Sequence, residues 1–194
     1  MAVRTFKIAT MTPPIGRHKD RDAGTADRIT RILLVIYLLV MTWILLFKLG
    51  VEFSYMSERR MNLMPFREVI AGYARLDRME TLLNVFIFVP MGLYVGILFR
   101  NWPMRAKLAV FLLISAAFEL LQYVFRIGAF DATDLVTNSL GGLLGLLIYF
   151  TIEKIMGSPG RAQRLVNSLA ALGTLAVIAF LVSVKLGIGP IRYQ

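Results

Sequence analysis

The feature that most constrains this chain is a series of long apolar segments in which charged residues are almost absent. A helix needs about 20 apolar residues to cross the hydrocarbon core of a bilayer, because each residue advances the axis by about 1.5 Å. The segments that approach this length are residues 30–49, 81–99, 106–125, 134–154 and 165–186. The sequence therefore predicts an all-α polytopic membrane protein, a bundle of about five transmembrane helices.

The composition favours a membrane fold over a soluble one. Charged residues make up only 18% of the 194 residues, whereas soluble domains contain about 25%. Basic residues between the apolar segments give a net charge of +10, and we expect anionic lipid headgroups rather than nucleic acid to be the counter-charge. One histidine, His18, and no cysteine are present. Such a chain has no material for a multi-histidine or thiolate metal site, and we expect neither metal nor cofactor.

The polar segments suggest how the chain is divided. Residues 1–28 contain prolines, glycines and many charges without an apolar period, which predicts a flexible basic arm. Residues 29–187 form the predicted transmembrane domain, and 188–194 a C-terminal tail. The long loop 49–80 has an apolar, proline-broken centre, residues 61–66, which we expect to lie in the membrane interface or against the bundle.

The distribution of lysine and arginine predicts the orientation. More basic residues fall in the N-terminal arm and the even-numbered connections than in the odd-numbered ones. Because basic loops are retained in the cytoplasm, this bias favours a cytoplasmic N-terminus and a C-terminus outside the cell.

Polar side chains enter the membrane at the same predicted end of three spans. Spacings of three and four residues put several of them on one helical face. In the third span this face contains Ser115, Glu119, Gln122 and Arg126. In the fourth span it contains Asp134, Asn138, Gly141 and Gly145. With Asn84 near the start of the second span, these side chains are positioned to converge at the outer leaflet.

Glu119 is the strongest functional candidate, and a structural role is the alternative. It lies about 10 Å from Arg126 along the helix, deep enough that an unpaired carboxylate is costly. An intramembrane acid together with Asp131 or Asp134 could perform general acid and base work. Equally, Glu119 could pair with Arg126 or accept hydrogen bonds from asparagines, and one of the two aspartates could cap the fourth span.

Four sequence elements resemble those of the VanZ family. Asn84 to Gly92 resembles its N-x-x-x-F-x-P-x-G signature, and Glu119 to Gln122 its E-x-x-Q element. Asp131 to Gly141 resembles D-x-x-D-x-x-x-N-x-x-G, and Asn62 to Phe66 is similar to its NLIPF stretch. The elements occur in the expected order over about residues 60–150. Residues 126–130 depart from the family, in which many relatives carry Gly-Arg before the aspartates.

The resemblance implies an integral membrane protein associated with resistance to teicoplanin-type glycopeptides, which is a phenotype without a mechanism. We expect an outer-leaflet polar pocket that binds or modifies an envelope lipid or lipid-linked headgroup. The candidate catalytic residues are Glu119, Asp134 and Asn138. The candidate substrate-binding residues are Asn84, Gln122, Arg126 and Asp131. A membrane-embedded enzyme and a non-catalytic, partner-organising membrane protein both stay open, whereas the small number of spans and the lack of an inverted repeat disfavour a transporter. Membrane lipids are the expected partners, and the oligomeric state is left open.

Overall fold

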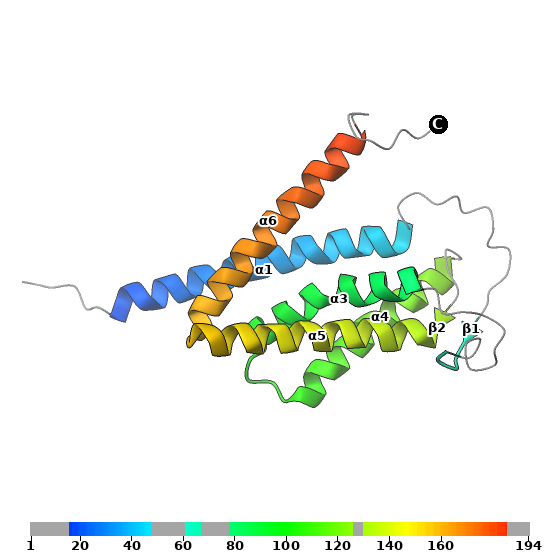
Figure 1. The fold of residues 1–194 in the computed structure, drawn as a ribbon, viewed down its shortest axis with the longest axis horizontal. Coiled ribbons are helices and arrows are strands. Elements are labelled where there is room, and N and C mark those ends of the chain that lie inside the picture. The colour runs from blue at the N-terminus through cyan, green and yellow to red at the C-terminus, as the bar shows by residue number, and fades with distance from the viewer. Residues whose placement is uncertain (1–15, 48–60, 67–77, 126–129, 186–194) are drawn as a thin grey trace, which may run out of the picture.

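The protein is an all-α membrane bundle. The computed structural model describes residues 16–47, 61–66, 78–125 and 130–185 (Figure 1). Its helices are α1 (Gly16–Phe47), α3 (Arg78–Leu98), α4 (Met104–Phe125), α5 (Ala132–Met156) and α6 (Pro159–Lys185). All five are long and apolar enough to cross a membrane. The predicted fold class, an all-α multi-pass bundle, is confirmed.

All five helices begin earlier than the predicted spans, α1 and α6 by the widest margin. α1 starts at Gly16, inside the predicted arm 1–28. No proline follows Pro14 until Pro65, so a helix already formed in the membrane can extend outward, since propagation is easier than nucleation. α6 starts at Pro159 rather than at residue 165, because proline suits the first position of a helix. The rest of the predicted arm and the tail 188–194 lie outside the described residues.

Glycines allow α3 and α5 to pack backbone against backbone. A Cβ added at Gly92 would collide with the carbonyl oxygen of Gly142 and lie 2.8 Å from the Cα of Gly145. One added at Gly141 would collide with the carbonyl oxygen of Val85 on α3. Small residues are what permit such close approach between membrane helices. Gly92 and Gly141 are therefore packing residues of the α3 and α5 pair.

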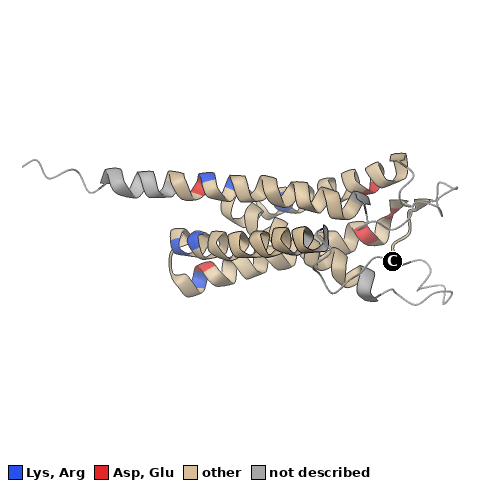
Figure 2. Ribbon diagram, turned by 90° about the horizontal axis from the view of Figure 1, so that it is seen from above, with Lys and Arg blue, Asp and Glu red and all other residues tan. Residues whose placement is uncertain are grey.

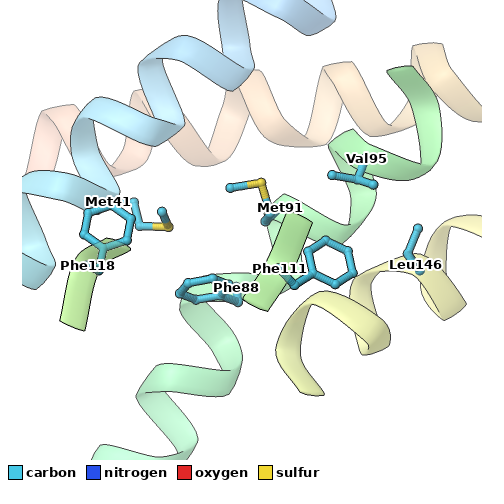
Figure 3. Packing of buried hydrophobic residues seen from close by; sticks show 7 residues of the cluster. All are labelled: Met41, Phe88, Met91, Val95, Phe111, Phe118 and Leu146. Atoms are coloured by element: carbon cyan, nitrogen blue, oxygen red, sulfur yellow. The ribbon is translucent and has the colours of Figure 1, made fainter. Parts of the chain in front are cut away.

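The apolar core lies between this helix pair and its neighbours α1 and α4. Phe88, Met91 and Val95 project from α3, Phe111 and Phe118 from α4, and Met41 and Leu146 from α1 and α5 (Figure 3). Because the interiors of proteins are closely packed, these side chains fix how α4 and α1 sit against the α3 and α5 pair. The core thereby positions the ends of α3, α4 and α5 relative to one another.

A second, polar contact joins α1 to α6. Thr30, which is fully buried, donates to Ala26 O and to Asn167 Oδ1, both at 2.9 Å. Asn167 donates back to Ala26 O at 3.2 Å, and Gln163 donates to Thr30 Oγ1 at 3.0 Å and to Asp27 at 2.8 Å. Beyond this contact α6 diverges from the bundle (Figure 1). We call these five residues the α1–α6 polar contact.

Charged side chains divide between the two ends of the bundle. Figure 2 shows Lys and Arg gathered toward the end where α5 meets α6, together with some acidic residues, and acidic residues without described basic ones at the opposite end. The described basic side chains belong to the start of α1, the α3–α4 connection and the α5–α6 connection. The opposite end contains Glu119, Asp131 and Asp134, and no described side chain there is basic. The polar residues that the sequence analysis singled out thus lie at the end with fewer cations.

Candidate functional site

A pair of two-residue strands organises the acidic end of the bundle. β1 (Met61–Asn62) lies parallel to β2 (Phe130–Asp131), with Asn62 opposite Asp131. Asn62 Nδ2 donates to both carboxylate oxygens of Asp131, at 3.3 and 3.4 Å. The apolar segment 61–66 therefore lies against the bundle, which was one of its two predicted positions.

Asp131 connects three parts of the fold. Its carboxylate accepts the N–H of Thr133 at 2.7 Å and caps α5, as an aspartate does where the positive end of a helix emerges. Its own N–H donates to Glu119 Oε2 on α4 at 2.9 Å. The side chain therefore holds the start of α5, and its backbone ties that start to α4. The capping alternative considered for this residue is confirmed.

Phe66 has a backbone conformation that a bulky residue rarely adopts. Its φ is 56°, in the left-handed region that favours glycine. The N–H of Phe66 donates to Thr133 Oγ1 at 3.1 Å, in the first turn of α5. A strained residue persists only where its surroundings hold it. The segment after β1 is therefore fastened to the start of α5 as well as to Asp131.

One turn into the bundle, Asn84 links α3 to α5. Its Nδ2 donates to Asp134 Oδ1 at 2.7 Å, and Asn84 is buried. Hydrogen bonds to a charged acceptor are shorter and stronger than neutral ones. The convergence predicted for the second and fourth spans is present in this contact.

A further turn down, α4 meets α5 through Ser115 and Asn138. Asn138 Nδ2 donates to Ser115 Oγ at 2.9 Å. Both side chains are buried, with Asn138 only 2% exposed. Asn138 Oδ1 has no hydrogen-bond partner among the described residues. This contact places an unpaired carbonyl oxygen deep in the bundle.

Of the other two candidates, Gln122 lies apart from these contacts. Gln122 is buried, as its helical face predicted, but it donates to Leu45 O on α1 at 2.9 Å. Arg126 lies outside the described residues, so its predicted role in substrate binding and the alternative of a pair with Glu119 both stay predictions. Glu119 itself is 3% exposed.

The residues that share these contacts form what we call the polar end cluster. Its members are Asn62, Asn84, Ser115, Glu119, Asp131, Thr133, Asp134 and Asn138. Carboxylates and amides dominate it, so it is suited to bind polar groups within the membrane. In the described part of the chain, no three His, Cys, Asp or Glu side chains are placed to hold a metal ion.

Sequence reasoning missed two members and assigned no function to a third. Asn62 stood in a recognised motif, but the strand pairing that brings it to Asp131 joins residues 69 positions apart. Thr133 lies between two acidic candidates, in the first turn of α5 and outside the predicted span 134–154, so no sequence signal singled it out. Ser115 was on the predicted buried face and was given no role. Spacing along one helix predicted which side chains are buried. It did not predict which residues of other elements they contact.

Comparison with known proteins assigns the family. The family model VanZ/LLP1 matches residues 34–153. The chain belongs to the VanZ family. A VanZ family relative, Protein VanZ of Enterococcus faecium, is 36% identical over 158 residues, which cover 79% of this chain and 91% of that protein. No solved structure matches the chain significantly. The matched range contains every member of the polar end cluster, whereas α6 lies beyond it.

Proposed function

We propose that this VanZ family protein binds the polar headgroup of an envelope lipid, or of a lipid-linked envelope precursor, at the polar end cluster. By occupying or presenting that lipid, it lowers the sensitivity of the cell to teicoplanin-type glycopeptides. One observation carries the proposal: polar side chains from β1, α3, α4 and α5 converge at one end of an otherwise apolar membrane bundle. Polar residues inside a membrane are costly and by default functional.

The charge distribution supports placing the cluster in the outer leaflet. The described Lys and Arg side chains gather at the other end of the bundle (Figure 2), and basic ends are retained in the cytoplasm. With that orientation, the cluster faces the side of the membrane on which glycopeptides act. A headgroup entering from the outer leaflet would meet Asp131 first, then Asp134, then Asn138.

Chemical modification of the lipid is the second candidate. It is favoured by the position of Glu119, whose carboxylate accepts the backbone N–H of Asp131, a residue that carries a second carboxylate. Against it, the described contacts of the carboxylates are structural: Glu119 holds a backbone N–H, Asp131 caps a helix and Asp134 accepts from Asn84. Binding without proton transfer therefore accounts better for the arrangement.

Expression in a teicoplanin-susceptible Gram-positive host tests the proposal. The wild-type chain should raise the minimum inhibitory concentration of teicoplanin. Asn84→Leu should lose this effect, because it removes the donor of the α3–α5 contact. Asp134→Asn should weaken it, because a neutral amide oxygen is a weaker acceptor than a carboxylate. Thr151→Val is the matched control, since Thr151 is an exposed residue of α5 at the far end. Immunoblots of membranes establish equal protein levels, and full resistance in both cluster variants would refute the proposal.

A further inference from the structure

The hydrogen-bond inventory of the polar end cluster is unbalanced. In the described part of the chain, two buried side-chain polar atoms have no hydrogen-bond partner, and both are carbonyl oxygens: Asn62 Oδ1 and Asn138 Oδ1. The corresponding amide nitrogens are engaged, with Asp131 and with Ser115. The buried groups left over are therefore acceptors and not donors.

Asn138 is the more informative of the two. The side chain is almost completely buried, and its nitrogen donates to Ser115 Oγ. Buried polar groups in proteins are nearly always paired, because an unpaired one loses its hydrogen bonds to water without compensation. Asn138 lies one turn below Asp134 on the same helical face, about 6 Å along the axis.

Resting on the proposed function, we propose that the headgroup bound here belongs to the class of hydrogen-bond donors. It carries ammonium or hydroxyl hydrogens, and the carbonyl oxygens of Asn138 and Asn62 accept them. A headgroup that offers only acceptors, such as a phosphate with a quaternary amine, leaves both oxygens unpaired. The carboxylates of the cluster, which are acceptors when ionised, favour the same class.

Lipid competition measures this preference directly. The purified full-length protein in detergent is given equimolar phosphatidylethanolamine and phosphatidylcholine, and bound lipids are counted by native mass spectrometry. The two lipids share the phosphate, but only the first has N–H donors. We expect about tenfold more phosphatidylethanolamine bound, the factor for one hydrogen bond to a buried acceptor. A second arm replaces phosphatidylethanolamine with diglucosyl-diacylglycerol, whose donors are hydroxyls, and separates an ammonium ligand from a sugar ligand.

The outcomes distinguish this inference from the proposed function. If phosphatidylcholine binds as well as both donor lipids, and Asp134→Asn reduces the binding of all three, lipid binding at the cluster stands and the donor class is wrong. If no lipid binds, or if Asp134→Asn changes nothing in any arm, the proposed function fails as well. If the protein prefers either donor lipid and Asp134→Asn abolishes that preference, the result supports both the proposed function and the donor class.

Substitutions at two neighbouring residues of α5 test which residue causes the lipid preference. Asn138→Leu removes the unpaired oxygen with little change in size and should bring the lipid ratio near one. Thr137→Val removes a neighbouring buried hydroxyl, whose hydrogen bond among the described residues is to Asp134 O within α5, and should keep the wild-type ratio. A preference that survives in Asn138→Leu overturns the role of Asn138. If that variant does not fold, the wild-type ranking of the lipids still decides the donor class.

Discussion

Substitution of Glu119 by leucine and by glutamine separates its structural role from a chemical one. Glu119 Oε2 accepts the N–H of Asp131 at 2.9 Å, at the point where α5 begins. Glutamine offers a carbonyl oxygen to the same N–H, whereas leucine leaves it unpaired in a buried site. A hydrogen bond to a charged group contributes about 1.5–3 kcal/mol. For a chain of this size each kcal/mol shifts Tm by about 2–4 °C, so Glu119→Leu should lower Tm by about 3–12 °C.

Intrinsic fluorescence of the two tryptophans during heating in detergent measures this difference without added dye. Glu119→Gln should stay within about 3 °C of wild type, because the main contact is kept. In the resistance assay it should also retain most of the phenotype, since binding requires no proton transfer. A leucine variant as stable as wild type would refute the role of Glu119 at the start of α5. A stable glutamine variant without any phenotype would instead favour the enzymatic candidate.

Further predictions concern packing, orientation and the far end of the bundle. Gly141→Leu should sharply reduce the yield of monodisperse protein, because its side chain would collide with α3; Gly173→Leu should not, since a Cβ there meets nothing within 4 Å among the described residues. In intact cells, a membrane-impermeant thiol reagent should label Leu63→Cys and spare Ser158→Cys, and the reverse pattern would invert the orientation. Asn167→Leu should destabilise the protein by about 0.6–1.7 kcal/mol per lost bond in thermal scans, and an unchanged Tm would show that the α1–α6 polar contact contributes nothing.

Helical periodicity was enough to predict the buried polar face of α4. The spacing of Ser115, Glu119 and Gln122 put them on one side, and all three are buried. The same reasoning did not predict that their partners differ: Gln122 contacts α1, whereas Glu119 contacts the start of α5. A helical period reports which face is covered, but the covering element depends on tertiary packing. The predicted roles of these residues in binding or catalysis are still to be tested.

Contacts between distant segments could not be predicted from one sequence. Asn62 reaches Asp131 through two-residue strands, which are too short to give an alternating pattern. Thr30 and Asn167 are 137 positions apart, and each belongs to a segment where polar residues are expected near the membrane surface. Lys107 is similar: a cation at the edge of a span suggests snorkelling, yet it is buried and donates to Arg100 O at 3.3 Å. In each case a partner on another element changes what the residue does.

The α1–α6 polar contact has a consequence for biosynthesis. α1 enters the membrane first, whereas Asn167 is available only once α6 has been inserted. Until then Thr30 has a partner within its own helix, since its hydroxyl donates to Ala26 O, so α1 can wait in lipid without an unpaired hydroxyl. When α6 arrives, the Thr30 hydroxyl gains Asn167 Oδ1 as an acceptor and accepts a hydrogen bond from Gln163 Nε2. Insertion of α6 therefore completes the hydrogen bonds at this end of α1, whose other part is held by the apolar core and by Gln122 of α4.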